Sequence, residues 1–191
     1  MQQEKGLESI SSSSVTFIGG KKYDCDAIIL CTGYLYTYPF LHSRCGVEIG
    51  DQKVTPLYMH MFLINDPTLA IWAIPKLILP FPIYDQQVKV FLKFLKGIIQ
   101  LPSKEVMLKE AEDDFKQRIE LGFKHRHAHL MSGEIQWKYD DKLSKLGDIN
   151  PIPESTRNLF RHVRTVRLQD IIHYKNKKYC IIDDKCFEEI D

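Results

Sequence analysis

Two short apolar runs stand out in the hydrophobic pattern of the first half of the chain. Residues 27–31 read Ala-Ile-Ile-Leu-Cys without a polar interruption, and a second run over 68–74 ends at Pro75. Both runs are too short for a helix and are rich in β-branched residues, which favours strands buried on both faces of a parallel sheet. The pattern therefore predicts an α/β fold, with Cys31 as a small core residue.

The rest of the chain predicts helices at the surface of that core. Residues 83–98 repeat apolar side chains at steps of three and four, which is typical of one buried helical stripe. Residues 104–121 are mostly charged, and Ser103 is placed to cap that helix. A last short helix is expected over 154–163, after the proline at 153.

Turn-forming residues indicate hairpins between these elements. Gly19 and Gly20 are expected to form a hairpin turn between two short strands, and 42–56 contains a possible short hairpin. A terminal hairpin is expected over 174–182, with its turn at 176–177. Residues 1–14 are polar and are interpreted as a loose lead-in.

Composition sets the outer limits. The 191 residues are 44% hydrophobic and 27% charged, which suits one domain with a sizeable core. The net charge of +1 gives no general attraction to nucleic acid or to an anionic membrane. No apolar run approaches the roughly 18 residues that a transmembrane helix needs, so no membrane-spanning segment is expected.

The first apolar run stops at a pair of residues suited to ligand contact. Thr32 offers a hydroxyl, and Gly33 lacks the Cβ that would keep a ligand away from the backbone. In open α/β sheets, ligands bind just beyond the carboxyl ends of the strands. Aromatic residues follow at once, beginning with Tyr34.

Two sequence blocks resemble the flavin-containing monooxygenases. The first runs from Asp26-Ala27-Ile28-Ile29 through Cys31-Thr32-Gly33-Tyr34 to Tyr38-Pro39-Phe40-Leu41. The second joins Leu57-Tyr58-Met59-His60 to Pro67-Thr68-Leu69-Ala70, Pro80-Phe81-Pro82, Asp85 and Gln87. The resemblance is clear from about residue 24 to residue 103. At Ala73 the chain departs from the family, which usually has glycine there.

The resemblance implies an incomplete fold. The family builds its FAD and NADPH sites on two G-x-G-x-x-G turns, and this chain contains neither. It is similar to the C-terminal part of a Rossmann-like flavoprotein with two dinucleotide-binding domains and surface helices. Residues 1–23 would form the lead-in and hairpin, 24–103 the end of the FAD-binding domain, and 104–191 a helical extension.

The resemblance also implies a chemistry. In the family, NADPH reduces bound FAD, and a flavin hydroperoxide formed with O2 oxygenates a soft nitrogen or sulfur nucleophile. This chain would contribute cofactor contacts rather than catalytic residues or a metal site, through Thr32, Gly33, Tyr34, Pro75, Lys76 and Gln87. For Gln87, a hydrogen bond to a nearby backbone group is the competing interpretation. The implied location is the cytoplasm, or the cytosolic face of the endoplasmic reticulum as a peripheral protein.

Other interpretations stay open. The chain could instead be a short, non-catalytic paralogue or splice product that binds a partner, for instance the full-length enzyme. Four arginines at 157, 161, 164 and 167 could meet a phosphate such as that of NADPH, or lie solvated beside acidic neighbours. The alternating histidines at 125, 127 and 129 favour a structural or pocket role over a metal site. Unpaired apolar edges predict low solubility of the isolated chain.

Overall fold

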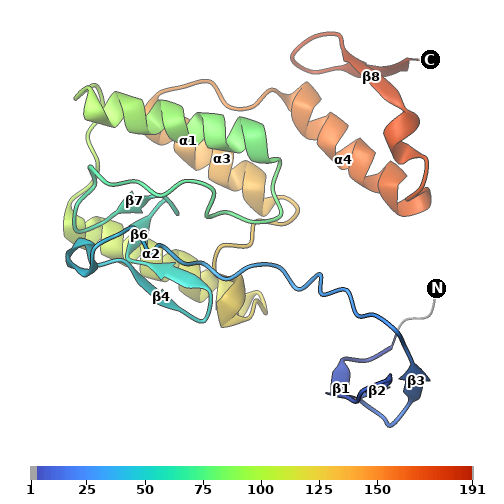
Figure 1. The fold of residues 1–191 in the computed structure, drawn as a ribbon. Coiled ribbons are helices and arrows are strands. Elements are labelled where there is room, and N and C mark those ends of the chain that lie inside the picture. Colours follow the sequence, from blue (N-terminus) through green and yellow to red (C-terminus); the bar gives the residue numbers. More distant parts are fainter. Residues whose placement is uncertain (1–3, 191) are drawn as a thin grey trace. The chain divides into compact units, whose positions relative to one another are not determined.

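A computed structural model describes residues 4–190, and its helices and strands are shown in Figure 1. The chain divides into two compact units, Met1–Leu35 and Tyr36–Asp191, which are described separately below. The model mixes helix and sheet, as the sequence predicts.

The first unit is a small antiparallel sheet. Strands β1 (Leu7–Ile10), β2 (Ser14–Phe17) and β3 (Lys22–Asp24) pair in the order β1-β2-β3. The turn between β2 and β3 contains Gly19 and Gly20, both with positive φ, which confirms the predicted hairpin. Strand β1 lies within the segment that was expected to be a loose lead-in, so that expectation is wrong.

The apolar run at 27–31 is not a strand in this chain. It has no regular secondary structure, and Ile29 and Leu30 are 87% and 75% exposed. Cys31 is exposed as well, so the predictions of a buried strand and a core cysteine are both wrong. A doubly buried strand needs a neighbour on each edge and cover on each face. Among residues 4–190, no strand pairs with this run.

The second unit begins with two hairpins. Strands β4 (Glu48–Gly50) and β5 (Lys53–Thr55) form the first, which confirms the possible hairpin at 42–56. Strands β6 (Leu57–Tyr58) and β7 (Phe62–Leu63) form the second and lie in the core. A one-turn 3-10 helix, η1 (Ser43–Cys45), precedes them.

The second apolar run, at 68–74, forms only one isolated bridge, between Ala70 and Phe62, so the predicted strand is wrong. The backbone turns within the run, because Ala73 has a φ of 62°. This left-handed conformation is the one that favours glycine, which gives a physical reason for the family's preference at that position. Ile71 and Ile74 are nevertheless buried.

Four helices complete the second unit. They are α1 (Pro80–Leu95), α2 (Lys104–Glu120), α3 (Ile135–Gly147) and α4 (Glu154–Gln169). The first two were predicted, and Ser103 caps α2 by accepting a hydrogen bond from Val106 N–H. Helix α4 is longer than predicted.

Helices α1 and α3 lie side by side (Figure 1), and together with the β6–β7 hairpin and α2 they contribute residues to the main core. The contact is close at Gly147, where an added Cβ would lie 2.7 Å from Val90 Cγ2. A glycine at this point lets the two helices approach each other. Aromatic contacts extend the core outward, since Phe62 packs against Phe91 and Phe94.

Two more 3-10 helices and a terminal hairpin complete the described elements. Helix η2 (His125–His127) precedes α3, and η3 (Tyr174–Asn176) follows α4. Strands β8 (Lys178–Ile181) and β9 (Phe187–Ile190) form the predicted terminal hairpin, but its turn lies at 182–186 and not at 176–177. None of the helices within residues 4–190 is long and apolar enough to cross a bilayer.

Candidate functional site

The predicted cofactor residues fall into two groups. Thr32, Gly33 and Tyr34 belong to the first unit, and Pro75, Lys76 and Gln87 belong to the second. The two groups of residues therefore lie in different units and are described separately.

Thr32, Gly33 and Tyr34 lie in an exposed, irregular segment. Tyr34 is 96% exposed. Gly33 has a φ of 82°, and no atom lies within 4 Å of the place that a Cβ would occupy. The backbone at Gly33 is thus open to close approach by a ligand. An apolar groove of about 390 Å³ runs beside residues 27–30 in the same unit.

Pro75 and Lys76 form a turn that is held by aromatic hydroxyls. Tyr84 OH donates to Pro75 O at 3.1 Å, and Tyr36 OH donates to Ile74 O at 2.6 Å. The Lys76 ammonium lies 4.1 Å from the centre of the Tyr36 ring, within cation–π range. Burial raises the pKa of Tyr36, so its hydroxyl stays protonated and available as a donor.

The same turn pairs with the segment that precedes α3. Lys76 N–H donates to His129 O, and Met131 N–H donates to Lys76 O, each at 2.9 Å. These two bonds form a parallel bridge between residue 76 and residue 130. The position of Lys76 therefore depends on the position of His129.

Gln87 is fully buried inside α1. Its Nε2 donates to Tyr139 OH, and Tyr139 OH donates to Met59 O, each at 2.7 Å. Gln87 Oε1 is buried without a hydrogen-bond partner. The side chain thus links α1 to α3 and, through Tyr139, to a backbone carbonyl. This favours the structural interpretation of Gln87, and its role as a cofactor contact stays a prediction.

A second, largely buried polar cluster joins His60, His129, Asp114 and Arg118, which come from three separate parts of the chain. Val54 N–H donates to His129 Nε2 at 2.9 Å. His129 Nδ1 lies 2.9 Å from His60 Nδ1. His60 Nε2 lies 3.3 Å from Asp114 Oδ2, which accepts from Arg118 Nε at 2.7 Å.

Both histidines are held neutral by their surroundings. Burial, together with the nearby charges of Arg118, Lys53 and Lys76, lowers the pKa of His129 to about 2. Burial also lowers the pKa of His60, although Asp114 opposes that shift. For Asp114, burial alone would raise the pKa, but His60 and Arg118 lower it below its ordinary value.

The three alternating histidines do not form one cluster. His129 contacts His60, whereas His125 packs edge-on against Phe115. Within the part of the chain that the structure describes, no group of three or more His, Cys, Asp or Glu side chains is arranged to hold a metal ion.

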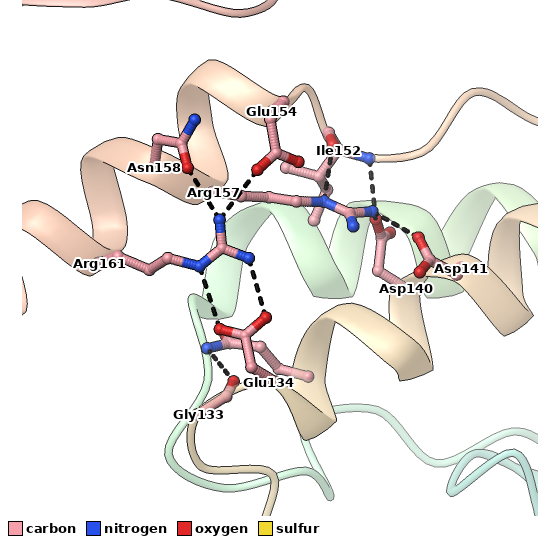
Figure 2. A network of polar contacts seen from close by, with 10 residues as sticks. Gly133, Glu134, Asp140, Asp141, Ile152, Glu154, Arg157, Asn158 and Arg161 are labelled. Carbon is pink, nitrogen blue, oxygen red and sulfur yellow. Dashed lines mark hydrogen bonds and ion pairs between the residues drawn. The ribbon is translucent and has the colours of Figure 1, made fainter.

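Two of the four arginines of α4, Arg157 and Arg161, contact carboxylates. Figure 2 shows Arg157 between Ile152 and the side chains of Asp140 and Asp141, with Arg157 Nη2 2.6 Å from Asp140 Oδ2. Arg161 makes a bidentate contact with the Glu134 carboxylate. The alternative in which acidic neighbours surround these two arginines is therefore the one that the structure supports.

Sequence reasoning missed α3 and the partners of His129. Helix α3 carries Ile135, Tyr139 and Leu143 at steps of four, all in or against the main core, and this spacing was a signal for a helix. The contact between His60 and His129 spans 69 residues. No local pattern announces such a contact.

Comparisons with known proteins identify the family to which the chain is similar. Residues 4–157 match the model of the family described as flavin-binding monooxygenase-like. Flavin-containing monooxygenase FMO GS-OX-like 2 from Arabidopsis thaliana is 36% identical over 132 residues, which are 69% of this chain and 28% of that protein. FMO GS-OX-like 5 from the same plant is 37% identical over 143 residues, 72% of this chain and 31% of that protein.

Two solved structures have folds similar to that of this chain. S-allyl-L-cysteine S-oxygenase from Allium sativum superposes with a TM-score of 0.78 at 34% identity, over 85% of this chain and 37% of that one. Tmm from Pelagibacter sp. strain HTCC7211 has a TM-score of 0.71 at 22% identity, which bears on the fold alone. The part of the chain that matches the two Arabidopsis thaliana proteins spans less than a third of their length.

Proposed function

The chain belongs to the flavin-binding monooxygenase-like family, and from this premise we propose that it forms the C-terminal portion of a flavin-dependent monooxygenase. The reaction would use NADPH and O2 to oxygenate a soft nitrogen or sulfur nucleophile, an amine or a sulfide. The Allium sativum relative is an S-oxygenase, which supports a sulfur substrate.

The observation that carries the proposal is the state of residues 27–35. This segment matches the family's first block and contains Gly33, whose backbone is unobstructed. Its apolar side chains are nevertheless exposed. Apolar surface of this kind is normally covered by further structure. We propose that strands of a Rossmann-like, two-domain flavoprotein cover it, supplied by segments with no counterpart among these 191 residues.

The residues present suit a flavin in part. Thr32 and Gly33 offer a hydroxyl and an unobstructed backbone, and the Pro75–Lys76 turn offers a rigid wall held by Tyr36 and Tyr84. Bound FAD, reduced by NADPH, would supply the redox chemistry and the oxygen transfer. The chain's own residues would orient the cofactor and exclude water from its surroundings.

Two further parts of the proposal rest on the resemblance alone. The partner would be the nucleotide-binding segments, or a full-length enzyme if the chain exists as a short, non-catalytic product. The location would be the cytoplasm or, peripherally, the cytosolic face of the endoplasmic reticulum.

A chimera tests the function. Residues 24–190 replace the matching C-terminal part of the Allium sativum S-oxygenase, and NADPH consumption is measured with a sulfide substrate, together with the sulfoxide formed. The proposal predicts bound flavin and sulfide-dependent product. A Gly33→Val variant should lose flavin, because a branched side chain at φ 82° is strained and blocks the backbone, whereas Gly122→Val, at φ 84° beyond the end of α2, tests strain alone.

Two outcomes would contradict the proposal. One is a chimera that folds and retains flavin but forms no product from amines or sulfides. The other is equal loss of flavin in both glycine variants, which would remove Thr32–Gly33 from the cofactor site.

A further inference from the structure

The hydrogen bonds around His60 and His129 point in one direction. Because Val54 N–H is a donor, His129 Nε2 must be an unprotonated acceptor. A neutral His129 then carries its proton on Nδ1, which donates to His60 Nδ1 at 2.9 Å. His60 in turn carries its proton on Nε2, where the acceptor Asp114 Oδ2 and the donor Arg118 Nη2 each lie 3.3 Å away. The tautomers of both rings follow from a single backbone amide.

This arrangement has no place for another proton. A proton on His60 Nδ1 would set two donors against each other across the 2.9 Å between the rings. A proton on His129 Nε2 would face Val54 N–H in the same way. Either event breaks a buried hydrogen bond, and an unmade buried bond is costly. The series of hydrogen bonds through the two rings ends at the Val54 backbone amide. Because this amide cannot give up its proton, the series cannot conduct protons.

The groups that face the pair add to this effect. Cations come from β5 (Lys53), the 74–77 turn (Lys76), α2 (Arg118) and α3 (Lys142), and they disfavour a second positive charge. Asp114 on α2 is the carboxylate in contact with the pair, and Arg118 already neutralises it. The rings of Tyr36 and Tyr139 close the remaining sides at 6.0 and 5.7 Å.

His129 connects β5 to the Pro75–Lys76 turn. Its side chain binds β5 through Val54, and its backbone carbonyl binds Lys76 N–H. We propose that the His60–His129 pair is an acid-sensitive latch, which holds β5 and the Pro75–Lys76 turn against residues 128–131 while both rings are neutral and releases them when a proton enters. The latch belongs to this chain and stands whether or not a flavin binds.

Hydrogen exchange of residues 1–191, read by mass spectrometry at pH 7.5 and pH 5.0, tests the latch. In the open state each ring would titrate near its ordinary pKa of about 6.5, and each proton taken up raises the opening equilibrium about 30-fold at pH 5.0. Protection factors of peptides that contain Val54 and Lys76 should fall by at least that factor. Peptides from the middle of α1, around Val90, should keep their protection.

Paired variants separate the latch from general acid sensitivity. His60→Gln with His129→Gln replaces each ring by an amide that donates and accepts but does not titrate, so the pH effect at Val54 and Lys76 should vanish. His125→Gln, an exposed histidine on the same connection, should leave the effect intact.

Three results would overturn the proposal. Equal loss of protection in β5 and α1 at pH 5.0 would indicate global acid unfolding. Unchanged protection at both sites would mean that the pair takes up no proton. Persistence of the pH effect in the double glutamine variant would assign it to other groups. The wild-type chain alone decides the first two, even if the double variant does not fold.

Discussion

Arg157 is expected to be worth far more to stability than Arg161, although both lie on α4, one turn apart (Figure 2). The Arg157 side chain is 10% exposed and bonds Asp140, whose side chain is fully buried. The same Asp140 Oδ2 accepts from Ile152 N–H, and Arg157 Nε donates to Ile152 O. Replacing Arg157 by alanine leaves a buried carboxylate without its cation.

The magnitude follows from this burial. Removing one partner of a buried ion pair costs about 3–5 kcal/mol in the free energy of unfolding. Arg161 is 37% exposed, and its partners Glu134 and Glu154 are more exposed still, so Arg161→Ala should cost about 0.2–1 kcal/mol. Both arginines stack over Trp137, at 5.4 and 5.8 Å, so that contribution is matched between the two variants.

Urea denaturation followed by Trp137 fluorescence, in a Trp72→Phe background, measures the difference. With a slope of about 2 kcal/mol per molar urea, the midpoint should fall by about 1.5–2.5 M for Arg157→Ala and by less than about 0.5 M for Arg161→Ala. Equal shifts for the two variants would refute the reasoning, because burial would then not govern the strength of these ion pairs.

The pH gives a second check on Arg157→Ala. Burial raises the pKa of Asp140 even with Arg157 present, and removing the cation raises it further. A carboxyl whose pKa is higher in the folded than in the unfolded chain favours folding more as the pH falls. The deficit of the variant should therefore shrink between pH 7 and pH 5, by up to about 1.4 kcal/mol per pH unit. A constant deficit would mean that Asp140 has the same protonation state in the folded wild type and the folded variant over this range, so that removing Arg157 does not raise its pKa.

Three further substitutions test the packing and the backbone, each by its effect on the urea midpoint. Gly147→Ala should destabilise by about 1–3 kcal/mol, because its Cβ would lie 2.7 Å from Val90 Cγ2, and adding Val90→Ala should recover part of that loss; a neutral Gly147→Ala would contradict the close α1–α3 contact. Ser103→Ala should cost about 1 kcal/mol by removing the cap of α2, and no loss would mean that water replaces the cap. Ala73→Gly should stabilise by about 0.5 kcal/mol, since φ is 62°; destabilisation would show that the methyl group packs usefully.

The success of the sequence reasoning followed the range of the interactions. Helices α1 and α2 were predicted because their apolar spacing and the Ser103 cap are local signals. The run at 27–31 was misjudged because a buried strand is defined by neighbouring strands, which lie outside its own sequence. The run at 68–74 was misjudged because one left-handed residue, Ala73, turns the backbone.

The site shows the same division. A motif match selected Thr32, Gly33, Tyr34, Pro75, Lys76 and Gln87, but it could not reveal that Gln87 is fully buried or that the turn at Pro75 is held by two tyrosines. Tyr36 and Tyr84 are brought to that turn from 38 and nine residues away. Only the folded backbone creates such contacts.

The central claim is that this chain supplies a C-terminal portion whose cofactor site is completed by other segments. Flavin retention tests it most directly: residues 1–191 are mixed with FAD, passed through gel filtration, and the visible spectrum is recorded with and without NADPH. We expect residues 1–191 alone to retain no flavin. Bound flavin that NADPH bleaches would contradict it, since the chain would then hold a working cofactor site by itself.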